Sequence, residues 1–184
     1  MRRTLACFLL LATASAHAAE PELPKNFIEY EPGFASSGQP TPAQLVDLAK
    51  RGYERIVYLA FSDHKTSLEG LDRHAENAGL QYVQIPVVWD APSAADYALF
   101  AAVMKANQDQ PTLVHCQVNF RASAFAFLHR VIEQGVPVAQ AKADMNRIWT
   151  PTAGWNEFLF AVLKAHDIDP QCEGCDWTPW DPKA

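Results

Sequence analysis

Apolar and polar positions along the chain follow two periods, one typical of buried strands and one typical of amphipathic helices. Short β-branched and aromatic runs at residues 55–61, 81–88 and 112–115 predict three strands. Elsewhere, apolar residues recur at intervals of three and four, which predicts helices. The predicted helices run from residue 42 to the glycine at 52, over 66–78, from 93 past 104, from about 121 to before 135, over 138–149 and over 153–166.

Two of these helix starts carry the signature of a capping box. Thr41 is the expected N-cap of the first helix, with Pro42 at the first helical position and Gln44 three residues after the cap. Ser93 and Asp96 repeat this spacing at the third helix. The pattern therefore favours a capping role for Asp96 over a catalytic one.

Alternation of strands with helices predicts the fold class. Parallel strands need crossover connections, and helices of this length supply them with the usual right-handed sense. The expected fold is α/β, with a parallel central sheet flanked by helices. A chain of 184 residues has room for one domain of this kind. We expect it to span residues 19–167, followed by a C-terminal tail at 168–184 without regular period.

The first 18 residues are typical of a secretory signal peptide. Arg2 and Arg3 precede an apolar run at residues 5–12, and small residues end at Ala18, where we expect cleavage. The mature protein is therefore expected in the periplasm or secreted. No later segment is apolar for long enough to span a bilayer, so no membrane span is expected in the mature form.

Charge narrows the range of partners. Without residues 1–18 the chain has 13 basic and 21 acidic side chains, a net charge of −8. Nucleic acid is therefore not an expected partner, since binding to it depends on an excess of Lys and Arg. A phosphorylated substrate or another small oxyanion remains possible, because one arginine and a ring of amides can hold it locally. The sequence makes no prediction of oligomeric state.

Three cysteines remain after the predicted cleavage. Cys172 and Cys175 are three residues apart in the tail and are expected to form a local disulfide, as in other exported proteins. A redox role for this pair, including exchange with Cys116, is the alternative. Two cysteines with no histidine partner do not make a zinc site, and no metal or other cofactor is expected. Cys116 is left alone and needs another explanation.

The segment 111-PTLVHCQVNFRASAFAF-127 offers one. Cys116 lies at the end of a predicted strand, and four residues separate it from Arg121 at the start of a helix. Backbone N–H groups in such a loop, with the helix N-terminus, can bind an anion and favour a thiolate. Arg121 adds a fork suited to two oxygens of a tetrahedral oxyanion. The candidate nucleophile is Cys116, and the candidate anion-binding residues are Gln117, Val118, Asn119, Phe120 and Arg121.

The chain resembles a known family through 37-SGQPTPAQL-45, 82-YVQIPV-87 and 112-TLVHCQVNFRAS-123. These segments are similar to small bacterial cysteine phosphatases related to the beta-lactamase-hydrolase-like group, which have the dual-specificity phosphatase fold. The resemblance runs from about Phe27 to about Ala165. It implies that the protein hydrolyses phosphate monoesters through a thiophosphoryl-cysteine intermediate.

The resemblance also implies roles for further residues. Asp90, between a strand end and the next helix, would protonate the leaving oxygen. Asp63 and His64 follow another strand end and are candidates for the pocket lining, although surface solvation is the simpler interpretation for both. His115 would orient the loop. Asn119 stands where relatives usually have glycine, and it tolerates the left-handed conformation better than most residues. Ser123 stands one position later than the hydroxyl residue that supports the thiolate in many relatives, because Ala122 intervenes.

Two other functions fit the same loop. A rhodanese-like sulfurtransferase would carry a persulfide on Cys116, but sulfur transfer gives Asp90 no alkoxide to protonate. A catalytically silent oxyanion-binding module would keep the pocket without turnover.

Overall fold

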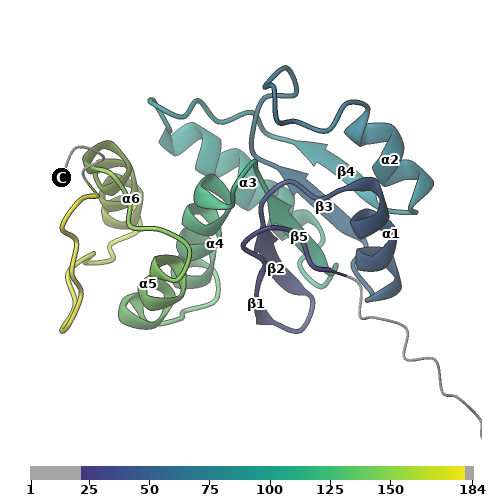
Figure 1. Cartoon of the computed structure of the whole chain (residues 1–184). Helices are drawn as coiled ribbons and strands as arrows, with labels where there is room; N and C mark the ends of the chain where they lie inside the picture. The colour runs from purple at the N-terminus through teal and green to yellow at the C-terminus, as the bar shows by residue number, and fades with distance from the viewer. Residues whose placement is uncertain (1–21, 181–184) are drawn as a thin grey trace, which may run out of the picture.

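A central sheet of five strands organises the protein. The computed structural model describes residues 22–180, so the predicted signal peptide at 1–18 lies outside the described residues. Figure 1 shows helices on both sides of the sheet, with α1 and α2 on one side and α3 to α6 on the other. The elements are β1 Ile28–Glu31, β2 Phe34–Ser37, α1 Pro42–Lys50, β3 Arg55–Tyr58, α2 Leu71–Asn77, β4 Gln81–Gln84, α3 Ala94–Ala106, β5 Thr112–His115, α4 Phe120–Ile132, α5 Val138–Asn146 and α6 Ala153–Ala165.

The strand order is β1-β2-β5-β3-β4. β2, β5, β3 and β4 run parallel, whereas β1 is antiparallel to β2 at one edge. The predicted α/β class with a mostly parallel sheet is therefore confirmed. The hairpin of β1 and β2 was not predicted, because β2 consists of Phe, Ala and two serines. Burial of all four β2 residues compensates for their weak strand preference.

Most predicted helices form close to their expected bounds. Both capping boxes are present, at Thr41 with Gln44 and at Ser93 with Asp96. The prediction of a helix over 66–78 is wrong at its start, since α2 begins only at Leu71. Gly70 precedes it in the left-handed conformation with φ of 64°, and the Ser67 hydroxyl donates to the Phe61 carbonyl at 2.8 Å. Residues 61–70 therefore form a loop fastened by its own side chains.

The register of the parallel strands brings three loops to one edge of the sheet. Tyr58 is paired with His115 on one side and with Gln84 on the other, and these residues end β3, β5 and β4. The chain beyond each strand therefore leaves the sheet at the same edge. The three loops are residues 61–70 after β3, 85–93 after β4 and 116–119 after β5.

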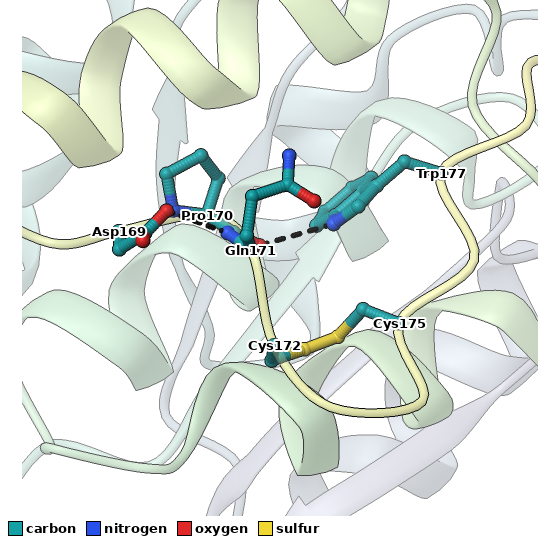
Figure 2. Close-up of a disulfide and its surroundings, with 6 residues drawn as sticks. All are labelled: Asp169, Pro170, Gln171, Cys172, Cys175 and Trp177. Atoms are coloured by element: carbon teal, nitrogen blue, oxygen red, sulfur yellow. Dashed lines mark hydrogen bonds between the residues drawn. A yellow bond between two sulfur atoms is a disulfide. The ribbon is translucent and has the colours of Figure 1, made fainter.

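The C-terminal tail lies against α4, α5 and α6. The predicted disulfide between Cys172 and Cys175 is present, and the Trp177 indole donates to the Pro170 carbonyl at 3.0 Å (Figure 2). Trp177 also packs edge-on against Phe160, with ring centroids 4.9 Å apart, and the Lys142 ammonium lies 4.7 Å from its ring centroid. The tail thus covers apolar side chains of the helices although it has no regular structure of its own.

Candidate active site

Cys116 lies at the carboxyl end of β5, a strand whose four residues are all buried. Its backbone N–H donates to the Ser37 carbonyl at 3.2 Å and thereby extends the pairing with β2. The residue is 1% exposed, and it forms no disulfide with any cysteine of residues 22–180. Strands β2 and β3 flank β5 and hold Cys116 in place. Open parallel sheets usually bind ligands at the carboxyl ends of their strands, which is where Cys116 lies.

The loop after Cys116 directs two backbone carbonyls toward segments near the N-terminal end of the domain. The Gln117 carbonyl accepts from the Gln39 N–H at 3.1 Å, and the Val118 carbonyl accepts from the Asn26 amide at 3.0 Å. A trans peptide directs its N–H opposite to its C=O, so the Gln117 carbonyl fixes the Val118 N–H on the other side of the loop. The Val118 N–H is therefore directed away from Gln39.

Close packing around Gly38 supports this arrangement. A Cβ atom added at Gly38 would come within 3.0 Å of the Gln117 carbonyl oxygen and 3.1 Å of the Lys25 carbonyl oxygen. Glycine therefore lets the chain at 38 lie directly against the loop, which a side chain would push away.

Asn119 makes the turn from the loop into α4. It adopts the left-handed conformation with φ of 75°, in agreement with the expectation for asparagine at a position usually held by glycine. Its side-chain amide donates to the Asn26 carbonyl at 2.6 Å. Within the described part of the chain, no side chain caps the N-terminus of α4. The first-turn N–H groups and the partial positive charge of the helix therefore remain available to an anion.

Arg121 is half-buried and is anchored by three groups. Its Nε donates to the Val87 carbonyl at 3.0 Å, and its Nη1 donates to the Gln117 side-chain oxygen at 2.8 Å. The guanidinium also lies over the Trp89 ring, 5.3 Å from the centroid. These contacts connect the loop after β4 to the loop after β5. They leave the outer end of the guanidinium for an oxyanion, which can replace the neutral Gln117 oxygen as a stronger acceptor.

Asp90 follows Trp89 in the loop after β4 and is exposed. It lies three residues beyond Val87, whose carbonyl holds Arg121. Asp96 is occupied as predicted, since one of its carboxylate oxygens accepts from the Ser93 N–H at 2.9 Å and the Ser93 hydroxyl at 2.7 Å. Asp90 is therefore the freer of these two carboxylates.

His115 is fully buried beneath the loop, with its ring stacked on Tyr58 at a centroid distance of 4.7 Å. Within residues 22–180, neither ring nitrogen has a hydrogen-bond partner of good geometry. Burial lowers the pKa of His115 to about 3, opposed by an interaction with the backbone of Cys116. The imidazole is therefore neutral at physiological pH. Its role in orienting the loop by hydrogen bonding remains a prediction.

The buried imidazole should make folding sensitive to acid. A His in the unfolded chain has a pKa of about 6.5 and is protonated below that pH. In the folded state His115 stays neutral down to about pH 3, so acid favours the unfolded state. The contribution of His115 to stability is therefore highest above pH 6.5, and we expect this residue to lower the free energy of unfolding by about 1.6 kcal/mol between pH 6.5 and pH 5. Urea denaturation at both pH values measures this. His115→Phe should reduce the loss by that amount, and an unchanged loss would contradict the assignment.

Ser123 lies within an aromatic cluster beside the loop. Its hydroxyl donates to the Phe120 carbonyl and accepts from the Trp149 indole, both at 3.1 Å. Phe120 stacks on Trp149 with ring centroids 4.8 Å apart. Among the described residues, the contacts of the Ser123 hydroxyl thus serve helix α4 and the aromatic cluster, and support of the Cys116 thiolate remains a prediction.

A pocket opens where the loop after β3 meets the loop after β5. Asp63 and His64, expected from the sequence to be solvated surface residues, line it together with Gln117 and Arg121. Phe61 and Lys65 complete its lining.

Sequence reasoning did not identify the side chains that connect these loops. The Gln117 amide donates to the Tyr58 hydroxyl at 3.1 Å and accepts from Arg121, so it bridges β3 and α4. The sequence predicts Tyr58 only as part of a buried strand. Trp89 directly precedes the predicted acid Asp90 in the sequence, but its contact with Arg121 depends on the fold.

No group of three or more His, Cys, Asp or Glu side chains within residues 22–180 is placed to hold a metal ion. In the same part of the chain, no helix combines the length and apolar character needed to cross a membrane.

Comparisons with known proteins agree on the kind of domain. A family model described as DSP-PTPase phosphatase fused to NAD+ kinase matches residues 19–156. A beta-lactamase hydrolase-like protein from Xylella fastidiosa is 30% identical over 111 residues, which cover 59% of this chain and 26% of that protein. The match therefore spans about a quarter of the length of this curated relative.

Solved structures show the same fold. A DUF442 protein from Shewanella putrefaciens CN-32 is 28% identical, with a TM-score of 0.72 over 78% of this chain and 94% of its own. The core catalytic domain of the PP-IP phosphatase Siw14 from Saccharomyces cerevisiae is 15% identical, with a TM-score of 0.65 over 76% of this chain and 86% of its own. At that identity, Siw14 supports the fold alone.

Proposed function

We propose a function from the premise that the chain belongs to the family described as DSP-PTPase phosphatase fused to NAD+ kinase. The proposed function is hydrolysis of phosphate monoesters with Cys116 as the nucleophile. One observation carries this proposal. Cys116 directly follows the central strand β5, and three residues separate it from Phe120, the first residue of α4. Arg121 in the first turn of that helix is anchored by Val87 and Trp89. The arrangement can hold a tetrahedral oxyanion above the sulfur.

The reaction we propose has two steps. The Cys116 thiolate attacks phosphorus, so a sulfur–phosphorus bond forms while the bond to the leaving oxygen breaks. Asp90 gives its proton to that oxygen. Water then attacks the thiophosphoryl group, Asp90 takes a proton from the water, and inorganic phosphate and the thiolate are released. Arg121 and the loop N–H groups stabilise the charge on the equatorial oxygens in both steps.

Two assays separate this reaction from its alternatives. The purified protein is given p-nitrophenyl phosphate in one assay, and thiosulfate with a thiol acceptor in the other. A phosphatase releases phosphate from the first substrate only. Sulfur transfer without phosphate release would favour the rhodanese-like alternative. Calorimetric binding of inorganic phosphate without turnover in either assay would favour a silent binding module.

We expect Asp90→Asn to slow hydrolysis according to the leaving group. An asparagine cannot protonate the departing oxygen, so turnover of phenyl phosphate should fall about 100-fold, whereas p-nitrophenyl phosphate, with its more acidic phenol, should lose much less. Measuring kcat for a series of substituted phenyl phosphates tests this. Asp63→Asn is the matched control, since Asp63 lines the pocket but is not the proposed acid. A leaving-group dependence that changes in Asp63→Asn instead would transfer the role to Asp63.

We also propose that the protein acts outside the cytoplasm after cleavage following Ala18. The charged, apolar and small-residue segments of residues 1–18 support this, and so does a disulfide between Cys172 and Cys175, a bond that persists in oxidising compartments. Mass spectrometry of the periplasmic fraction should find a chain that begins at Ala19. An uncleaved chain confined to the cytoplasm would contradict the proposal.

A further inference from the structure

The loop over residues 61–67 is held against the candidate active site by hydrogen bonds to one side chain. The Tyr58 hydroxyl lies 3.0 Å from the Phe61 carbonyl and 2.5 Å from the Ser67 hydroxyl, and it accepts from the Gln117 amide at 3.1 Å. Burial raises the pKa of Tyr58, with the hydrogen bond to Ser67 opposing it, so the hydroxyl keeps its proton near neutral pH. Both ends of the loop are thereby tied to the residue that also contacts the loop after β5.

The hydrogen bonds of Tyr58 hold the loop so that the side chains of His64 and Lys65 lie at the pocket that contains Arg121. His64 and Lys65 line it together with Gln117 and Arg121. Lys65 is exposed and forms no salt bridge with the residues that the structure describes, 22–180. Its ammonium is therefore available to a ligand in the pocket.

His64 has a defined orientation. Its Nδ1 accepts from the Thr66 N–H at 3.2 Å and lies 2.8 Å from the Thr66 hydroxyl. Because a peptide N–H can only donate, Nδ1 is the unprotonated nitrogen and the neutral ring carries its proton on Nε2. The Nε2–H group is then a donor that is not used by the bonds to Thr66.

We propose that His64 and Lys65 form a second anion subsite, so that the substrate is a small molecule with a second phosphate group beside the one that is hydrolysed. The first phosphate binds at the loop after Cys116, and the second binds His64 Nε2–H and the Lys65 ammonium. Asp63, which lines the same pocket, carries the opposite charge, and Arg121 and Lys65 together outweigh it. This inference rests on the proposed phosphatase function and specifies its substrate class.

The subsite distinguishes this substrate class from a phosphorylated side chain of a protein. A single phosphoryl group on a tyrosine fills only the pocket at Arg121 and leaves Lys65 without an anionic partner. A bisphosphate fills both positions, and each charge-assisted hydrogen bond adds to its affinity. Tyr58 is a positioning residue in this account, because it acts through the loop and not on the substrate.

Competitive inhibition tests the proposal on the full chain. Hydrolysis of p-nitrophenyl phosphate is inhibited with methylphosphonate, which has one anionic group, and with methylene-, ethylene- and propylene-diphosphonate, which have two at increasing spacing. We expect at least one diphosphonate to bind about tenfold more tightly than methylphosphonate. Lys65→Gln should remove most of this advantage, His64→Ala part of it, and Tyr58→Phe should weaken it while leaving inhibition by methylphosphonate nearly unchanged.

Lys164→Gln is the matched control, because it makes the same change in charge on α6, outside the pocket lining. Equal losses in Lys164→Gln and Lys65→Gln, or diphosphonates that bind no better than methylphosphonate, would overturn the subsite. Failure of the proposed phosphatase function has a different signature, since p-nitrophenyl phosphate would then not be hydrolysed at all. In that case, calorimetry of the diphosphonates with the unmodified chain and with Lys65→Gln still decides whether the subsite exists.

Discussion

Replacing Cys116 with serine should abolish phosphate release, with a loss of about 10⁴-fold or more in kcat. A serine hydroxyl is a far weaker nucleophile than a thiolate, and within residues 22–180 no His ring nitrogen hydrogen-bonds the side chain of residue 116 to take its proton. The oxyanion pocket should survive, because serine and cysteine are similar in size and the loop is held by backbone contacts of Gln117 and Val118. The measurements are kcat with p-nitrophenyl phosphate and the affinity for inorganic phosphate by calorimetry.

The control for this substitution is the double variant Cys172→Ser with Cys175→Ser. It removes the other two cysteines of the predicted mature chain and breaks the disulfide in the tail, away from the loop after β5. Activity should be retained. Loss of activity in the double variant with retention in Cys116→Ser would reverse the assignment of the reactive cysteine.

The second large effect is expected for Arg121→Lys, with a loss of about 100- to 1000-fold in kcat/KM. Lysine keeps the positive charge but loses the planar fork, so it cannot donate to Val87 and at the same time to two oxygens of an oxyanion. The ammonium also loses the stacking of a flat group on Trp89. Affinity for inorganic phosphate should fall together with turnover, because the side chain acts in binding as well as in stabilising the transition state.

Arg73→Lys is the matched control, since Arg73 is an exposed residue of α2 paired only with Glu76 among its described neighbours. It should leave turnover unchanged. If Arg121→Lys retains nearly full activity and phosphate affinity, the guanidinium is structural, and the anion is held by the backbone N–H groups alone.

Local patterns in the sequence predicted the framework of the protein. The parallel strands β3, β4 and β5 consist mainly of apolar, β-branched and aromatic residues, and the capping boxes at Thr41 and Ser93 depend only on neighbours three residues away. The position of Cys116 before a helix follows from the same local information. These features were accessible because each is determined within a few residues of chain.

Contacts between distant segments could not be read in this way. The hairpin of β1 and β2 depends on burial against β5 more than on strand preference. The sequence predicts residues 66–70 as the start of a helix, because the hydrogen bonds of Ser67 to Phe61 and Tyr58 that form the loop exist only after the chain has folded. Hydrogen bonds connect Tyr58 through Gln117 to Arg121. Tyr58 and Gln117 are 59 residues apart, so no local sequence pattern predicts their contact.

The packing of Trp177 has a consequence for how relatives of this protein are compared. The matched family region ends at residue 156, yet the side chains of Phe127 and Phe160 are shielded by an indole that comes 17 to 50 residues after them. A homologue without this tryptophan must shield the equivalent helix surface by other means, such as smaller side chains or a neighbouring subunit. A comparison of this helix surface between relatives must therefore include a segment that lies beyond the matched region.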